Sequence, residues 1–254
     1  MPAETKFKRT IITGALPYAN GHIHLGHIAG AYLPADIYAR FKRLCGHPLL
    51  YICGSDEYGV PITLTALKEG CSPQEVIDRY HAANDESFAQ LGISFDIYGR
   101  TSWPIHTETT QAFFLNLYQG GHIEKREMEL WYSEQSDRFL PDRYVRGTCP
   151  KCGFEEATGD ECENCGAQYS ANDLIAPKAN IPGDSSTPIL KKTVHWFLRL
   201  QDFTGELTAW LDSHPEWRAN VKGIAYSWVD DLRARCITRD TDWGVPIPLD
   251  DPDT

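Results

Sequence analysis

The sequence has no apolar run that approaches the roughly 20 residues needed to cross a membrane. Residues 1–8 are too polar for a secretory signal, and there is no internal repeat or low-complexity tract. These absences favour a globular cytoplasmic protein that has no membrane partner. With 254 residues, 42% of them hydrophobic and 23% charged, the chain is long enough to bury the core of one large domain or two smaller ones.

Positive charge is in deficit, with 24 Lys and Arg against 35 Asp and Glu, which gives a net charge of −11. A nucleic-acid-binding enzyme needs a local basic surface rather than a basic total. The composition therefore does not exclude a nucleic-acid substrate. It indicates only that a basic patch would occupy little of this chain.

The eight cysteines do not resemble a disulfide framework, because four of them form two CxxC pairs. The pairs are Cys149 with Cys152 and Cys162 with Cys165. The scattered cysteines are expected to be small buried hydrophobes; they are Cys45, Cys53, Cys71 and Cys236.

Paired CxxC motifs predict a metal site, because four thiolates form the closed tetrahedral set of structural zinc. Gly153 and Gly166 follow the pairs and permit the chain to turn. A closed set leaves no open position for catalytic water, so we expect a compact knuckle in which Zn²⁺ folds a segment that has no core of its own. The alternatives are reduced thiols without metal and a redox dithiol.

Strand and helix patterns alternate in the first part of the chain, which predicts an α/β fold with a doubly wound parallel sheet. The expected elements are strands at 9–14 and 48–53, both buried, and helices at 35–44, 73–91 and 107–118. Ser72 and Glu75 form the capping signature of the second helix. Pro34 is expected to kink or break the helical segment that contains it. The buried side of the last helix is expected to comprise Phe113, Phe114, Leu117 and Tyr118.

The pattern changes near Gly120, where charged and turn residues become frequent and periodicity is lost. We expect an inserted module there, and a strand at 236–246 that re-enters the first domain. The expected limits are 1–119 for the first domain, 120–230 for the insert with a zinc knuckle at about 145–170, and 231–254 for the returning segment.

Residues 15–27, ALPYANGHIHLGH, lie between the first expected strand and helix. A strand, a tight turn and a helix N-terminus form an anion site, because unpaired N–H groups and the helix dipole point at the ligand. His24 and His27 add donors beside the turn, and Gly26 allows a flat ligand to approach the backbone closely. This arrangement suits binding and cleaving a nucleotide triphosphate.

Asp56 lies just past the carboxyl end of the second expected strand. Open α/β sheets bind their ligands at the carboxyl ends of the strands. A carboxylate at this position is suited to hold the ammonium group of an amino acid. The alternative is a turn residue that caps a loop.

The residues HLGH at 24–27 resemble the HIGH signature of class I aminoacyl-tRNA synthetases, and ALPYANG at 15–21 is similar to its methionyl branch. The resemblance continues through ICGSD at 52–56, FLPDRYV at 139–145, the double CxxC and WGVP at 243–246, in the family's order. Tyr58 departs from the pattern, because the family usually has histidine there. This chain therefore has no imidazole at that position.

The resemblance implies the N-terminal half of a Rossmann-like nucleotide-binding domain with an inserted connective-peptide domain that carries the zinc knuckle. It implies that methionine and ATP, with Mg²⁺, form methionyl-adenylate, and that the methionyl group then passes to tRNA. The catalytic residues implied are His24 and His27, which bind ATP together with Asn20 and Gly26. The methionine-binding residues implied are Ala15, Leu16, Tyr18 and Asp56.

The segment before the knuckle offers further contacts to the active site or to tRNA, through Asp142, Arg143 and Arg146. An ordinary cluster of surface ion pairs explains these three residues equally well. The oligomeric state is not indicated.

The second class I signature, KMSKS, and an anticodon-binding helical domain are absent from the sequence. We therefore expect the N-terminal portion of a longer enzyme, poorly active by itself.

Three alternatives to this function remain. A synthetase for isoleucine, valine or leucine has different residues before HxGH and usually a large editing insertion. A nucleotidylyltransferase has HxGH but no need for a four-cysteine insert. A non-catalytic zinc module that binds RNA leaves the HLGH turn unexplained.

Overall fold

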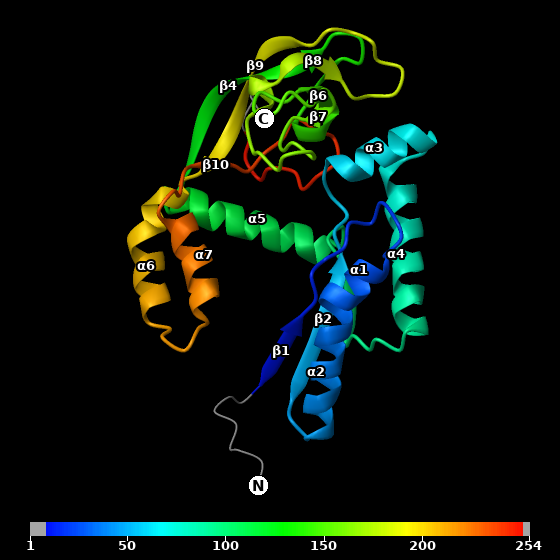
Figure 1. The fold of residues 1–254 in the computed structure, drawn as a ribbon, viewed down its shortest axis with the longest axis vertical. Coiled ribbons are helices and arrows are strands. Elements are labelled where there is room, and N and C mark those ends of the chain that lie inside the picture. The colour runs from blue at the N-terminus through cyan, green and yellow to red at the C-terminus, as the bar shows by residue number, and fades with distance from the viewer. Residues whose placement is uncertain (1–8, 251–254) are drawn as a thin grey trace. The chain divides into compact units, whose positions relative to one another are not determined.

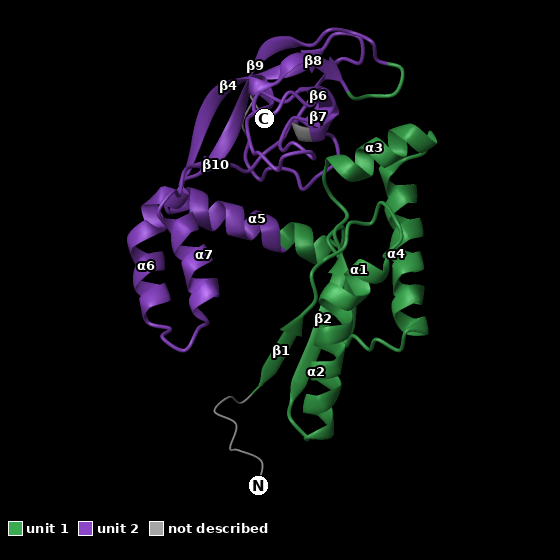
Figure 2. Ribbon diagram, viewed as in Figure 1, with its two compact units in different colours: residues 1–108, 180–183 green, residues 109–179, 184–254 purple. Residues whose placement is uncertain are grey.

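The computed structural model describes residues 9–250, apart from the side chain of Asp142. The chain forms two compact units (Figure 2). Unit 1 contains the described residues up to 108 together with 180–183, and unit 2 contains 109–179 and the described residues from 184 onward. The limits expected from the sequence, at 119 and 230, remain a prediction.

Unit 1 is built on a parallel sheet, which confirms the expected α/β class (Figure 1). Its strand order is β1 (Thr10–Thr13), β2 (Leu49–Ser55) and β3 (Ile97–Arg100). Parallel neighbours require crossover connections, which are usually helical. The helices in these connections are α1 (Leu25–His27), α2 (Leu33–Leu44), α3 (Val60–Glu69) and α4 (Pro73–Gln90).

The core of unit 1 is aromatic. Tyr32, Tyr51 and Phe88 are fully or almost fully buried, and the rings of Tyr32 and Phe88 meet edge to face at 4.7 Å. The Tyr32 hydroxyl donates a hydrogen bond of 2.8 Å to the carbonyl of Ala15. The core therefore anchors the beginning of the ALPYANG segment.

Strand β1 differs from its predicted character as a buried strand. Ile11 is 64% exposed, and the burial of β1 alternates along the strand. Within the described sheet, β1 lies at the edge and pairs only with β2. Hydropathy does not reveal which strand occupies an edge, so apolar content predicted more burial than the strand has.

The helical segment after HLGH is irregular just before Pro34, but it does not break there. A π-helical turn, η1 (Ile28–Tyr32), separates α1 from α2, although the backbone stays helical throughout. Proline has no N–H to donate, and its ring crowds the carbonyl four residues earlier. A widened turn before Pro34 relieves that crowding.

The capping prediction for α4 is confirmed. Ser72 Oγ accepts from the backbone N–H of Glu75, and the Glu75 carboxylate accepts from the N–H of Ser72 at 2.8 Å. Helix α5 (Pro104–Gln119) begins earlier than the expected residue 107, and its predicted buried face is covered only in part, with Phe114 and Leu117 half-buried. Phe113 is 67% exposed, and no described residue of α5 is buried. Burial depends on what covers a helix, which its own apolar residues do not reveal.

Unit 2 contains an antiparallel sheet that the sequence analysis did not anticipate. Its strand order is β10 (Arg235–Cys236), β9 (Ile189–Leu198), β4 (Ile123–Ser133) and β5 (Arg138–Phe139). Strands β4 and β9 pair from Ile123 with Leu198 to Tyr132 with Ile189. The strand expected at 236–246 is confined to β10, which pairs antiparallel with β9.

A smaller antiparallel sheet in unit 2 adjoins the CxxC motifs. Its order is β7 (Ala157–Thr158), β6 (Val145–Thr148) and β8 (Ile175–Ala179). Besides residues 109–119 of α5, the helical elements of unit 2 are α6 (Thr204–Asp212), α7 (Ala219–Val229) and the 3₁₀ turns η2 (Asp142–Tyr144), η3 (Ala171–Asp173) and η4 (Leu200–Phe203). Across residues 9–250, no helix combines the length and apolar character that a membrane crossing requires.

The expectation for the scattered cysteines is also wrong. Cys45 is exposed, while Cys53, Cys71 and Cys236 are half-buried. Cys45 follows the last residue of α2 directly, at a helix end that nothing in its local sequence identifies as solvent-facing.

Candidate active site and metal centre

His24 and His27 form a stacked pair at the start of α1. Their ring centroids are 3.8 Å apart, with planes inclined by 20°. His24 is the N-cap residue, and its Nδ1 accepts from the backbone N–H of Gly26 at 3.1 Å. The Nδ1 atom of His27 accepts from the backbone N–H of His24 at 3.2 Å. The two imidazoles thus form a reciprocal capping box.

This capping geometry assigns the tautomers of both rings. An Nδ1 atom that accepts a hydrogen bond carries no proton, so the proton of a neutral imidazole lies on Nε2. Each ring is exposed, so each presents an Nε2–H donor to solvent. Two exposed imidazole donors at a helix N-terminus form a local environment that favours negative charge.

Gly26 leaves room for the ring of His24 at the start of α1. A Cβ atom at residue 26 would lie 2.9 Å from His24 Cε1 and 3.0 Å from His24 Nδ1. A Cβ atom at residue 26 would therefore displace the imidazole from its capping position over the turn. The role predicted for Gly26 from the sequence, to let a ligand approach the backbone closely, remains a prediction.

The end of β2 lies beside the ALPYANG segment. The N–H of Asp56 donates to the carbonyl of Pro17 at 2.8 Å, and the N–H of Ala19 donates to the carbonyl of Asp56 at 2.9 Å. Tyr18 and Asp56 thereby form a parallel β-bridge. The structure thus brings together Tyr18 and Asp56, two of the residues implied for methionine.

The Asp56 side chain is half-buried, and its environment raises the pKa of the carboxyl group. Burial is the main cause of the increase, and the negative charge of Glu57 adds to it. The N–H of Tyr58, 3.4 Å from Asp56 Oδ1, and the imidazole of His106 act in the opposite direction. Burial prevails, so Asp56 takes up a proton more readily than an ordinary aspartate.

The other residues implied for ligand binding lie on the same segment. Leu16 is 54% exposed and Tyr18 is 50% exposed. Ala15 is exposed, and its carbonyl accepts from the Tyr32 hydroxyl. Asn20 lies in the turn that leads toward His24. Their roles toward ATP and methionine remain predictions.

In unit 2, the four cysteines of the CxxC pairs form one cluster in which all Sγ atoms lie within 4.8 Å of one another. Cys149 Sγ lies 4.0 Å from Cys165 Sγ, and Cys152 Sγ lies 3.6 Å from Cys162 Sγ. These separations are too long for disulfides, whose sulfurs are about 2 Å apart. Four sulfurs at about 2.3 Å from one Zn²⁺ would lie about 3.8 Å from each other, so the cluster fits a tetrahedral zinc site.

The two halves of the cluster share one backbone pattern. Gly153 N–H donates to the carbonyl of Cys149 at 3.0 Å, and Gly166 N–H donates to the carbonyl of Cys162 at 2.8 Å. Both glycines have positive φ, 76° and 68°, as the turn prediction requires. The N–H of Lys151 donates to Cys149 Sγ at 3.3 Å. The paired motifs are therefore two copies of one knuckle turn.

The basic residues before the knuckle form surface ion pairs. Arg143 lies 3.6 Å from Asp160, and Arg146 lies 3.5 Å from Glu156. All four side chains are more than a third exposed, so these pairs contribute little stability. For Asp142, the structure describes the backbone only.

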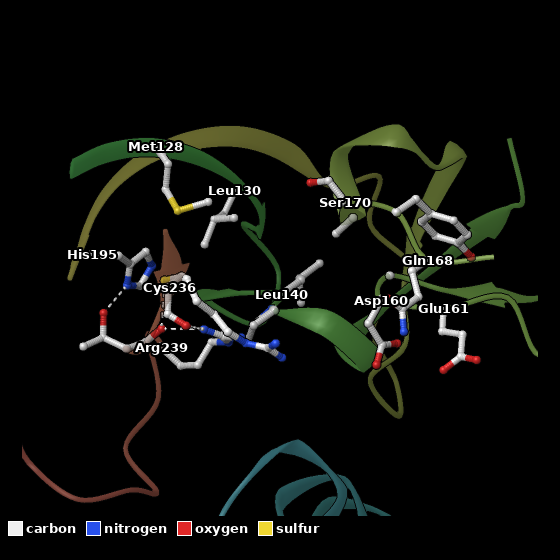
Figure 3. A pocket seen from close by; sticks show the side chains of 16 residues that line it. Met128, Leu130, Leu140, Asp160, Glu161, Gln168, Ser170, His195, Cys236 and Arg239 are labelled. Atoms are coloured by element: carbon white, nitrogen blue, oxygen red, sulfur yellow. Dashed lines mark hydrogen bonds between the residues drawn. The ribbon is translucent and has the colours of Figure 1, made fainter. Parts of the chain in front are cut away.

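The sequence analysis missed a cavity of about 390 Å³ in unit 2 (Figure 3). Met128 and Leu130 of β4 contribute apolar side chains, and His195 of β9 lies at its edge. His195 is buried, with Nδ1 2.9 Å from Thr238 Oγ1 and Nε2 3.1 Å from Asp240 Oδ2. The alternation of Met128 and Leu130 with glutamates was the one local signal of this half-buried strand.

A profile of the family described as tRNA synthetases class I (M) matches residues 10–254. The chain is 55% identical over 248 residues to methionine–tRNA ligase of Chloroherpeton thalassium and 52% identical over 249 residues to that of Porphyromonas gingivalis. Each match covers 97% of this chain but only 35% and 36% of the respective relatives. The chain thus spans about a third of the length of these relatives.

Two solved structures share the fold. Mycobacterium tuberculosis methionyl-tRNA synthetase in complex with methionyl-adenylate has a TM-score of 0.70 at 24% identity, over 97% of this chain and 44% of that chain. LeuRS from Agrobacterium radiobacter K84, in a ternary complex with tRNA and LeuAMS, has a TM-score of 0.60 at 22% identity, over 89% of this chain and 25% of that chain.

Gly26→Ala tests the packing of His24 over the helix start. A glycine-to-alanine change inside a helix normally stabilises a protein by up to about 1 kcal/mol. Here the methyl group displaces the His24 ring, and loss of the cap costs about 1 kcal/mol, so no net gain is expected in urea unfolding. Gly30→Ala is the matched control, because a Cβ there meets nothing within 4 Å. Equal stabilisation by both changes would contradict the assignment.

Proposed function

Because the chain belongs to the class I tRNA synthetases (M), we propose that it carries the methionine-activating site of a methionine–tRNA ligase. In that reaction methionine and ATP give methionyl-adenylate and pyrophosphate, and the methionyl group then passes to tRNA. One observation carries the proposal: the Asp56 backbone is hydrogen-bonded to Pro17 and Ala19, a few residues before the paired imidazoles of HLGH. A carboxylate for an ammonium group is thus hydrogen-bonded, through its backbone, to the segment that leads to the donors for a phosphate chain.

The triphosphate of ATP would lie at the helix start. The Nε2–H groups of His24 and His27 would donate to phosphate oxygens and stabilise the charge that develops as pyrophosphate leaves. Asn20 and Gly26 would complete this subsite, and Mg²⁺ would enter with ATP. Adenylation requires mainly positioning and charge stabilisation, which fixed donors supply.

Methionine would lie beside Asp56. The carboxylate would accept hydrogen bonds from the α-ammonium group, while Ala15, Leu16 and Tyr18 would line the side-chain pocket. An apolar pocket discriminates by only about 1–3 kcal/mol per methylene. The Tyr18 hydroxyl is a candidate for the polar contact that distinguishes a thioether from an aliphatic chain.

The cysteine cluster would hold one structural Zn²⁺. Bound zinc would fix the two knuckle turns, which carry few buried apolar residues of their own. Arg143 and Arg146, with Asp142, would contact the active site or tRNA, and their ion pairs with Asp160 and Glu156 are the competing explanation. A cytoplasmic location also remains a prediction.

The proposed function is tested by calorimetric titration of the chain with methionine and, separately, with leucine, isoleucine and valine. Methionine is expected to bind at least about tenfold more tightly than any of the three, as expected for a difference of about 1.4 kcal/mol. Absence of methionine binding, or equal affinity for leucine, would overturn the proposal. Catalysis is assayed separately, by methionine-dependent exchange of pyrophosphate into ATP.

Methionine affinity is expected to depend on pH through Asp56. Only the carboxylate binds the ammonium group, so affinity is full above the pKa of Asp56 and is lost below it. Burial raises this pKa, so the loss begins at a higher pH than an ordinary aspartate would produce. Asp56→Asn should weaken binding about 10- to 100-fold and abolish this pH dependence. Asp231→Asn, an exposed position in unit 2, is the matched control and should change neither.

Zinc content is expected to be about one ion per chain. Cys162→Ser removes a buried ligand and should reduce bound zinc to a small fraction, with an accompanying loss of stability in unit 2. Mass spectrometry of the metal content measures the first effect and proteolysis the second. Cys45→Ser removes an exposed thiol outside the cluster and should retain the zinc. A wild-type chain purified without zinc would contradict the assignment.

A further inference from the structure

Glu57, the residue after Asp56, is the most deeply buried carboxylate in the described part of unit 1, with a side chain that is 0% exposed. A buried carboxylate is costly unless it is paired and hydrogen-bonded. Arg100 Nε donates to Glu57 Oε1 at 2.7 Å, and the Ser102 hydroxyl donates to Oε2. The N–H of Glu57 itself donates to Thr101 Oγ1 at 2.8 Å. Three consecutive residues at the end of β3 thus hold one residue at the end of β2.

The network extends into α4. Arg100 Nη2 donates to Asp78 Oδ1 at 2.6 Å, at a carboxylate that is 51% exposed. His81 Nδ1 lies 2.7 Å from Ser55 Oγ and 3.8 Å from Glu57 Oε1, and its ring stacks on Tyr98 at 5.0 Å. Ser55 and Glu57 therefore point toward the same neighbours, as alternate residues of an extended chain do.

Asp56 lies between Ser55 and Glu57 in the sequence, and its backbone is hydrogen-bonded to a different segment. Its backbone makes two hydrogen bonds to the ALPYANG segment, at Pro17 and Ala19. The Asp56 carboxylate interacts instead with the Tyr58 N–H and with His106. The short stretch that carries Asp56 is thus anchored on one side by Glu57 and joined on the other to the segment implied for methionine.

We propose that Glu57 is a positioning residue for Asp56: its buried pairing with Arg100 and Ser102 fixes the end of β2, so that the Asp56 carboxylate and residues 17–19 keep one geometry. The inference rests on the proposed role of Asp56 in holding the methionine ammonium group. This positioning role explains why a carboxylate, that of Glu57, occupies a site that is buried from solvent. Buried ion pairs seldom stabilise a fold more than apolar side chains of the same size, whereas their directional hydrogen bonds set orientation.

The first test measures amide hydrogen exchange by NMR in the 254-residue chain, with Glu57→Gln as the variant. Exchange of the Asp56 and Ala19 amides is expected to accelerate about tenfold or more, because the anchor next to them is loosened. The Gly14 amide, which donates to Ile52 at 2.9 Å between β1 and β2, should remain protected. Unchanged Asp56 and Ala19 amides, or equal acceleration of all three, would overturn the proposal.

Asp78→Asn is the matched control, since it removes the same charge from the same arginine at its exposed end. It should leave the exchange of Asp56 and Ala19 unchanged, and an effect as large as that of Glu57→Gln would overturn the specific role of Glu57. Should Glu57→Gln fail to fold, Ser102→Ala keeps the charge and removes one donor. It should accelerate the same two amides to a smaller extent, and no acceleration would overturn the proposal.

The second test measures methionine affinity. Glu57→Gln should weaken binding about 10- to 100-fold, the effect of displacing a ligand-holding group by about 1 Å, while Asp78→Asn should not. Equal affinity of Glu57→Gln and wild type would overturn the positioning role in methionine binding. Failure of the wild-type chain to bind methionine would instead contradict the proposed function, and the exchange experiment would still decide whether Glu57 anchors Asp56.

Discussion

The pairing of β2 on both edges is the constraint on which the candidate site in unit 1 depends. Its backbone bonds to β1 on one side and to β3 on the other, so its path leaves little freedom where it ends. Beyond that end the chain alternates sides, with Glu57 directed to the buried network and Asp56 to the ALPYANG segment. A reactive side chain at the end of a central strand inherits the rigidity of the sheet.

The start of α1 is stabilised by hydrogen bonds between residues that are close in the sequence. Its first N–H groups need acceptors, and the side chains of His24 and His27 supply them. The same bonds determine which ring nitrogen carries the proton, so capping the helix and exposing the Nε2–H donors are one arrangement. Gly26 is part of this capping arrangement, because a Cβ atom there would lie 2.9 Å from His24 Cε1.

Unit 2 depends on another constraint. The small sheet β7–β6–β8 has short strands, and its buried apolar residues around the cysteines are few, among them Val145 and Ala157. Cys149 and Cys162 are buried between two knuckle turns of identical backbone pattern. Four cysteines gathered at this spacing are placed to hold a metal ion, whose coordination would stand in for a hydrophobic core.

Features that arise within a few residues could be predicted from the sequence. The capping box of Ser72 and Glu75, the irregular turn before Pro34 and the knuckle turns after each CxxC depend on hydrogen bonds and φ angles between near neighbours. Family motifs at 15–27 and 52–56 pointed to the class of protein. Tertiary structure decided what depends on distant partners: the exposure of Ile11 and Phe113, the pairing of Ile123 with Leu198, and the burial of Glu57 against Arg100. Burial and pairing are properties of the chain's path, and no local pattern specifies which distant segment will cover a side chain or complete its hydrogen bonds.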